Sequence, residues 1–172
     1  MIEFGKLKVS ADGDRGIVMS RVFDAPREVV FEAYVRPELV QHWLGVGGGW
    51  EMAVCIIEPR VGGTWRFVWN GPKGEQMGWR GVCRELTPPE RIKTVDSFDQ
   101  PWFQGTEVGT LAFSELGSRT LLTATLEYET REARDSVLAS PMAEGMAASY
   151  DRLAGILEAP ADQWMDQEAG VP

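Results

Sequence analysis

The chain has 172 residues, the length of one domain that buries about two thirds of the surface its unfolded form exposes. Its 44% hydrophobic and 25% charged residues are typical of a soluble globular protein, and no apolar run approaches the roughly 20 residues that span a bilayer, which excludes a membrane-spanning helix. The net charge of −9 disfavours nucleic acids and anionic membranes as partners, because both are bound through Lys and Arg.

The first elements are a strand and two short helices. The N-terminal sequence MIEFGKLKVSADGDRG lacks the pattern of a signal peptide, so we expect a cytoplasmic protein. Residues 16–23 read as a strand. In DAPREVVFEAYV, Asp24 is the predicted N-cap of a helix and Pro26 lies in its first turn. Pro37 ends this helix and begins a second one, PELVQHWL, before a glycine-rich stretch.

The middle of the chain alternates apolar and polar residues with a period of two, which indicates strands. Turn signals at NGPKG, TPPE and ELGS separate several of the segments. The predicted strands are 51–58, 63–70, 74–86, 90–98, 106–115 and 119–129. Six successive strands after the first one predict a single antiparallel sheet of about seven strands.

The C-terminal part is predicted to be helical. Thr130 is the expected N-cap of a first segment, and Ser140 before Pro141 is the expected N-cap of a long amphipathic helix that packs across the sheet. Gly145 lies inside this helix, where Ala is about 1 kcal/mol better, so we expect a strand or a ligand to approach its backbone. The prediction is an α+β helix-grip domain over residues 1–160, with a C-terminal tail at 161–172.

The two adjacent glycines of the stretch RVGGTWRFVWNG raise the question of whether it is a phosphate-binding loop. A phosphate loop needs a third glycine or a Lys-Ser/Thr pair at fixed spacing, and neither is present. Trp65, Phe67 and Trp69 instead alternate with polar or smaller residues, which indicates a strand with one apolar face. Pairing through the NGPKG turn places Met77 and Trp79 on the same face.

These residues belong to a larger apolar set with two interpretations. Large aromatics and methionines suit the walls of a ligand cavity, but the same stripe also suits an ordinary core. Trp102 and Phe103 lie in a predicted loop, where they either close a cavity or contact a protein. The complete set of candidate cavity-lining residues is Trp43, Trp65, Phe67, Trp69, Met77, Trp79, Phe98, Trp102, Phe103, Met142, Met146 and Tyr150.

Asp96 and Glu107 are the candidate polar groups of the cavity. By alternation, each shares a strand face with large apolar residues, where a carboxyl has a raised pKa and can move protons. We expect them to orient a ligand or to stabilise the fold rather than to catalyse. His42 is the only histidine, and Cys55 and Cys83 lack metal-ligand spacing, so we predict free thiols and assign no catalytic residue, metal or cofactor.

Several blocks of sequence resemble one known family in the same order. They are RVFDAPREVVFEAYVRPELVQHWLG, EPRVGGTWRF, LTPPERI, GTLAFSELGSRTLLTATLEY and REARDSVLASPMAEGMAASYDRLAGIL. Together they resemble the activator of heat-shock-protein-90 ATPase homologues, a family of the START and birch-pollen-allergen (SRPBCC) superfamily, over roughly residues 17–157. The resemblance implies a helix-grip fold that holds lipids, sterols, polyketides or other hydrophobic molecules, and a few members of the superfamily catalyse cyclisation or hydrolysis.

We therefore predict binding of a small hydrophobic ligand, such as a lipid, sterol or polyketide, between the sheet and the last helix. The first alternative is a protein-interaction module that regulates a chaperone. It ranks lower because eukaryotic activators of the family carry a further N-terminal domain, for which these 172 residues have no room. The second alternative is an enzyme for cyclisation or proton transfer on an apolar substrate. A homodimer is compatible with the sequence, but no residue demands one.

Overall fold

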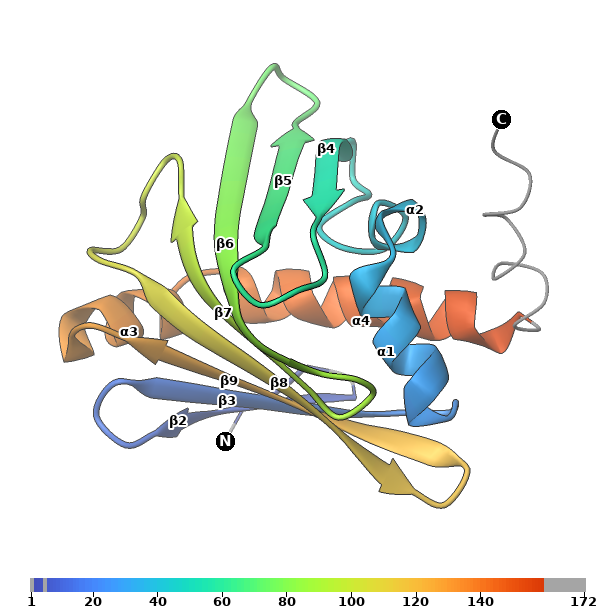
Figure 1. Ribbon diagram of the computed structural model, residues 1–172. Helices are drawn as coiled ribbons and strands as arrows, with labels where there is room; N and C mark the ends of the chain where they lie inside the picture. Colours follow the sequence, from blue (N-terminus) through green and yellow to red (C-terminus); the bar gives the residue numbers. More distant parts are fainter. Residues whose placement is uncertain (1, 5, 160–172) are drawn as a thin grey trace.

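A computed structural model describes residues 2–4 and 6–159 of the chain. These residues form one antiparallel sheet of nine strands, in the order β1-β2-β3-β9-β8-β7-β6-β5-β4. Figure 1 shows the sheet curving around the long C-terminal helix, with two short helices at one end. This arrangement confirms the predicted α+β helix-grip fold. The predicted tail, residues 161–172, lies outside the described residues.

The elements follow one another along the chain nearly as the sequence predicts. The strands are β1 (Ile2–Phe4), β2 (Leu7–Asp12), β3 (Gly16–Phe23), β4 (Glu51–Ile57), β5 (Thr64–Asn70), β6 (Gln76–Thr87), β7 (Arg91–Phe98), β8 (Glu107–Leu116) and β9 (Arg119–Tyr128). The helices are α1 (Arg27–Val35), α2 (Pro37–Val40), α3 (Arg131–Leu138) and α4 (Met142–Glu158). All six strands predicted after the first one are present.

The two N-terminal strands were not predicted, and they raise the count from about seven to nine. β2 pairs with β3, with Val9 opposite Met19, and β1 pairs with β2 at one edge of the sheet. Leu7 and Val9 alternate with lysines and are buried. Two apolar residues make too short an alternation to stand out in the sequence, so pairing with β3 is what stabilises this segment.

The junction between α1 and α2 depends on Trp43. Pro26, not Asp24, is the N-cap of α1. The carbonyl of Ala33 lies four residues before Pro37, which has no N–H to donate to it. Trp43 Nε1 donates to this carbonyl at 3.1 Å instead, and the Trp43 side chain is fully buried. The two helices are thereby fixed to each other and to the core.

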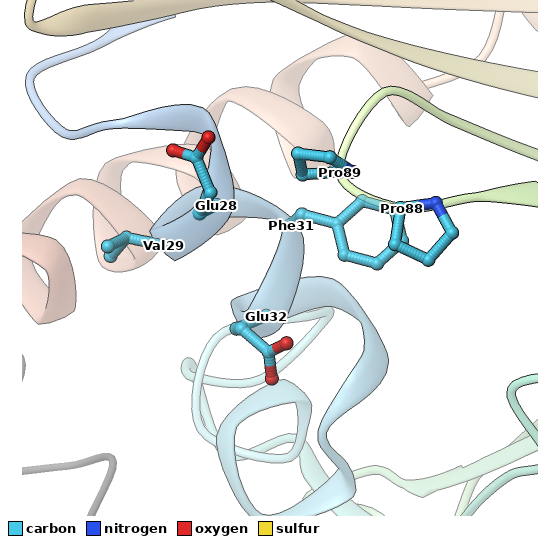
Figure 2. A pocket seen from close by; sticks show the side chains of 6 residues that line it. All are labelled: Glu28, Val29, Phe31, Glu32, Pro88 and Pro89. Atoms are coloured by element: carbon cyan, nitrogen blue, oxygen red, sulfur yellow. The ribbon is translucent and has the colours of Figure 1, made fainter.

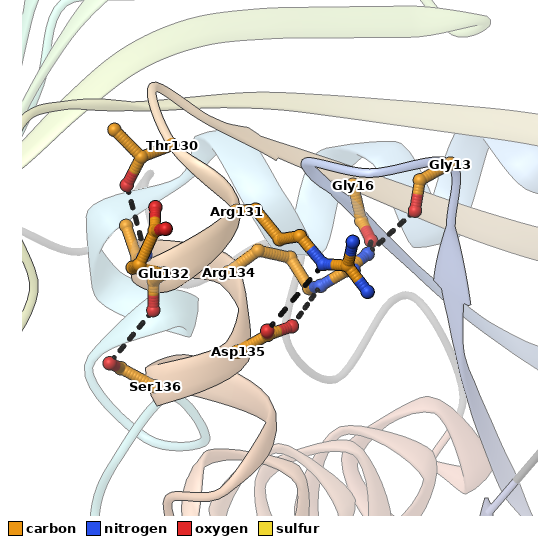
Figure 3. A network of polar contacts seen from close by, with 9 residues as sticks. Gly13, Gly16, Thr130, Arg131, Glu132, Arg134, Asp135 and Ser136 are labelled. Carbon is orange, nitrogen blue, oxygen red and sulfur yellow. Dashed lines mark hydrogen bonds and ion pairs between the residues drawn. The ribbon is translucent and has the colours of Figure 1, made fainter.

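A polar network attaches α3 to the N-terminal hairpin, as Figure 3 shows. Thr130 Oγ1 accepts from the backbone N–H of Ala133 at 3.0 Å, which confirms the predicted cap. The buried Arg134 donates through Nη1 to the carbonyls of Gly13 and Gly16, at 2.8 and 2.9 Å. One guanidinium thus provides donors for two carbonyls at the turn between β2 and β3 and holds α3 against this turn.

The fully buried side chains of helix α4 lie along its C-terminal half. Pro141, rather than the predicted Ser140, is its N-cap. Leu153 is fully buried, and Asp151 accepts from Arg21 Nη1 of β3 at 2.6 Å. At Gly145, in the N-terminal half, no neighbouring element lies within 4 Å of the position that a Cβ would take, so the close approach expected there is absent. Among the described residues, no helix is long and apolar enough to cross a membrane.

Candidate functional site

The apolar face predicted on β5 and β6 continues onto β7. Phe67 lies directly opposite Trp79, and Trp69 lies opposite Met77, so these side chains share one face of the sheet. The rings of Phe67 and Trp79 stack with centroids 4.9 Å apart and planes 13° from parallel. Trp79 is in turn paired with Phe98 of β7. A continuous row of large apolar side chains therefore crosses three strands.

Burial divides the predicted lining residues into two sets. The packed set, each member less than 9% exposed, is Trp43, Trp65, Phe67, Trp69, Phe103 and Tyr150. The half-open set consists of the half-buried Met77, Trp79, Phe98, Met142 and Met146 together with Trp102, which is 38% exposed. Two packed indoles also have structural hydrogen bonds, from Trp65 Nε1 to the Glu58 carbonyl and from Trp69 Nε1 to the Leu44 carbonyl. The half-open set is therefore the part of this face with apolar surface left for a ligand to contact.

The loop between β7 and β8 brings two aromatic side chains to this face. Trp102 and Phe103 contact each other and Phe98 edge-to-face, with ring centroids 5.2 to 5.9 Å apart. Phe103 also contacts Tyr128 of β9 edge-to-face, at 5.1 Å. The loop therefore lies across the ends of neighbouring strands, with Phe103 buried beneath it and Trp102 toward solvent.

Asp96 and Glu107, predicted separately, lie side by side on β7 and β8. They are paired across the two strands, and Glu107 is paired in turn with Tyr128 of β9. The Tyr128 hydroxyl donates to Glu107 Oε2 at 2.6 Å, and the two carboxyl groups hydrogen-bond to each other. Asp96 and Glu107 are 4% and 8% exposed. The register thus builds one buried acidic cluster from three strands.

The cluster retains a proton more readily than exposed carboxyls do. Burial, followed by the adjacent charge of Glu107, raises the pKa of Asp96 well above its ordinary value. Burial also raises the pKa of Glu107, although the Tyr128 hydroxyl and Asp96 both oppose that rise by hydrogen bonding. Burial and the same carboxylate raise the pKa of Tyr128. Two carboxyls that share a proton can accept hydrogen bonds and exchange protons with a bound molecule.

Two strand glycines make room for the Asp96 carboxyl. A Cβ on Gly81 of β6 would lie 2.7 Å from both Asp96 Oδ1 and Cη2 of Trp79, and one on Gly109 of β8 would lie 3.1 Å from Asp96 Oδ2. The carboxyl therefore rests between two glycine backbones, with Oδ1 on the side of the Trp79 ring. This oxygen has no hydrogen-bond partner among the described residues.

Sequence reasoning missed Tyr128, Gly81 and Gly109. Tyr128 shares a strand face with Leu122 and Ala124, so its place beside the acidic residues follows once the β8–β9 register is known. A glycine inside a strand often marks a place where another group approaches the backbone closely. The positions of Gly81 and Gly109 within strands were therefore a signal in the sequence.

The remaining candidates stay apart from this site. His42 is exposed, and no group of three His, Cys, Asp or Glu residues within 2–4 and 6–159 is placed to hold a metal ion. Cys55 and Cys83 are free thiols, and burial raises the pKa of both, that of Cys55 to about 11. Neither thiol is therefore activated as a nucleophile.

Two surface pockets lie elsewhere on the described chain. One, of about 340 Å³, lies between α1 and the turn from β6 to β7, and Figure 2 shows its lining by Glu28, Val29, Phe31, Glu32, Pro88 and Pro89. The other, of about 500 Å³, is a polar depression near Arg27, Arg91 and Glu115. Neither of these pockets lies between the sheet and α4.

Solved structures of several bacterial proteins are similar to this one. A protein of Rhodobacter sphaeroides is 32% identical, with 90% of this chain and 99% of that chain covered and a TM-score of 0.85. Protein CV1439 of Chromobacterium violaceum is 26% identical, with coverages of 85% and 99% and a TM-score of 0.74. Protein Ms6760 of Mycobacterium smegmatis, at 21% identity, shares the fold, with coverages of 89% and 97% and a TM-score of 0.79.

The comparison with curated proteins gives no match. The family model described as "Activator of Hsp90 ATPase homolog 1-like protein" matches residues 24–158, which run from just before α1 to the end of α4 and include the acidic cluster. This match spans most of the chain and agrees with the resemblance found in the sequence. The chain therefore belongs to the family of proteins like activator of Hsp90 ATPase homolog 1.

Proposed function

We propose that this protein binds a small hydrophobic molecule, of lipid, sterol or polyketide type, between the inner face of the sheet and α4. The observation that carries the proposal is incomplete burial of the half-open set. Met77, Trp79 and Phe98 on the sheet, with Met142 and Met146 on the helix, belong to the apolar cluster but remain half-buried. Proteins of this fold commonly bind hydrophobic ligands, and a bound molecule would complete the burial of these side chains.

The side chains at this face are of kinds that can move to admit a ligand. Methionines are unbranched and adapt to different shapes, and Trp102 and Phe103 lie on a loop rather than on a strand. We infer that these side chains occupy the ligand volume in the free protein and repack around the ligand.

The test is thermal unfolding of the purified protein with fatty acids, sterols, flavonoids and aromatic polyketides. A ligand at one hundred times its Kd stabilises by about 2.7 kcal/mol, which is roughly 5–10 °C for a domain of this size. Trp79→Ala should abolish the shift while the protein stays folded. Trp50→Ala, which truncates another half-buried tryptophan beside Gly71, should retain it. Absence of any shift across the panel would contradict the proposal.

A protein-interaction role is the second candidate, and a different observation favours it. Ile56, Val61 and Trp102 are 50%, 65% and 38% exposed, so each offers apolar surface that a protein partner could cover. The family's description points to a chaperone of the heat-shock-protein-90 class as the partner to try. The test is the ATPase rate of that purified chaperone with and without this protein, in which an unchanged rate would argue against the role.

The remaining expectations are also testable. Acid–base chemistry on an apolar substrate would need the Asp96 and Glu107 pair, so the variant Asp96→Asn/Glu107→Gln should then lose turnover while retaining binding of that substrate. A homodimer and a cytoplasmic location stay predictions, which sedimentation of the purified protein and microscopy of the tagged protein would examine.

A further inference from the structure

The acidic cluster lacks a positively charged partner. Among the ion pairs of the described chain, none involves Asp96 or Glu107, although both are almost completely buried. Their hydrogen-bonding neighbours are Tyr128 and Thr94, which are neutral. Buried charges are normally paired, since removing a charge from water is costly. No ion pair of the described residues compensates these carboxyls, so their ionisation in the folded protein is costly unless a bound cation pairs with them.

One oxygen of the cluster is directed at the half-open set. Asp96 Oδ1 is buried without a hydrogen-bond donor among the described residues, whereas the other polar contacts of the cluster involve Glu107, Tyr128 and Thr94. Oδ1 lies against Gly81 on the same side as the Trp79 ring. A buried acceptor without a donor is destabilising by about 1–3 kcal/mol, so it is a natural contact point for a donor on a ligand.

The surroundings of this oxygen favour a cation. Trp79 stacks on Phe67 and is paired with Phe98, and Phe103 lies against Tyr128. Aromatic faces attract cations, with tryptophan the most effective, and this attraction strengthens where water is excluded. An ionised carboxyl here would repel an anionic ligand, and a neutral alcohol would supply no positive charge to pair with it.

We propose that the molecule bound at this site is a hydrophobic amine, whose protonated nitrogen donates to Asp96 Oδ1 while its apolar part lies against Trp79 and Phe98. The inference rests on the proposed function and specifies its ligand class. The groups facing the nitrogen are Asp96 from β7, Glu107 from β8 and Tyr128 from β9, while β6 presents only Gly81 and Trp79. The ammonium would neutralise the cluster without any change in covalent structure.

The test compares three probes with the same chain: n-octylamine, 1-octanol and octanoate, titrated calorimetrically into the intact protein at pH 7. We expect octylamine to bind at least tenfold more tightly than octanol, and octanoate to bind most weakly. The variant Asp96→Asn/Glu107→Gln removes the charge but keeps the shape of both side chains. It should bring amine and alcohol affinities to within threefold of each other, with octanol binding unchanged.

Asp99→Asn is the matched control, because Asp99 lies one residue beyond β7 and its carboxylate pairs with Arg66, whose side chain is on the other face of β5 from Phe67. This control should keep the preference for the amine. Equal binding of the three probes would overturn the amine proposal and leave hydrophobic binding intact. Binding of none would also overturn the amine proposal, and the thermal-unfolding panel would then decide whether hydrophobic binding stands. If the double variant does not fold, the order of the three affinities on the unsubstituted protein still tests the proposal.

Discussion

The buried carboxyl pair should make the stability of the protein fall as pH rises. Burial raises the pKa of Asp96 in the folded state, so the carboxyl pair keeps a proton above the ordinary Asp pKa of about 3.9, near which the unfolded chain releases it. Wherever the folded state binds more protons than the unfolded state, the free energy of unfolding decreases with pH. The contribution is therefore fully present below that pKa and is lost as pH rises through the raised pKa of the pair.

One proton sets the magnitude. A difference of one bound proton between the folded and unfolded states changes the free energy of unfolding by at most about 1.4 kcal/mol for each pH unit. Asp96→Asn replaces the carboxyl by an amide that stays neutral at every pH and can donate to Glu107. The variant should match the unsubstituted protein near pH 3 and become progressively more stable than it as the pH rises above about 4.

Urea unfolding of both proteins at half-unit pH intervals measures this difference directly. Asp99→Asn is again informative, because hydrogen bonds and charge from Arg66 lower the pKa of Asp99. Its contribution has the opposite sign, since it is present above the unfolded pKa and is lost only as pH falls below about 4. Parallel stability curves for the Asp96→Asn and unsubstituted proteins from pH 4.5 to 8 would refute a shared proton in the acidic cluster.

Three further substitutions test the packing around the site by urea unfolding. Trp43→Phe keeps an aromatic ring but leaves the Ala33 carbonyl without its donor, so we expect a loss of about 1–3 kcal/mol, and a loss below about 0.5 would contradict the role of the indole N–H. Gly81→Ala should destabilise by about 1–3 kcal/mol because its methyl would meet the carboxyl and indole, whereas Gly145→Ala, with open space, should stabilise by about 0.5–1. If Gly145→Ala destabilised the protein more than Gly81→Ala, the close packing assigned to Gly81 would be contradicted. Thr130→Ala should cost about 1 kcal/mol and Thr130→Ser much less, since only the serine retains a capping hydroxyl.

Most of the fold could be predicted from the sequence, because local signals agreed with one another. Long alternating runs such as TWRFVWN identify strands, and the turn NGPKG sets the pairing that places Trp79 opposite Phe67. The strand at 7–12 was not predicted, because only Leu7 and Val9 alternate with polar residues in it. Its stability comes from pairing with β3. Here tertiary pairing supplies what local pattern does not.

The candidate site was predicted less completely, since it depends on register between strands far apart in the chain. Alternation placed Asp96 and Glu107 on apolar faces, which their burial confirms. It did not show that they are neighbours, nor that Tyr128 joins them, because that requires the pairing of three strands. The division of the aromatic set into packed and half-open members is likewise a property of three-dimensional packing and leaves no mark on periodicity.

The order of the strands also has a consequence for how the chain acquires its structure during synthesis. Each strand from β4 to β8 pairs with its immediate successor, so each of these hairpins can form soon after it is made. β3 is different, because one of its two partners is β9, about a hundred residues later. Until Arg119–Tyr128 has been made, that edge of β3 is open to pairing with another chain. The slow, non-local closure of this pair should govern both the folding rate and the tendency of truncated chains to aggregate.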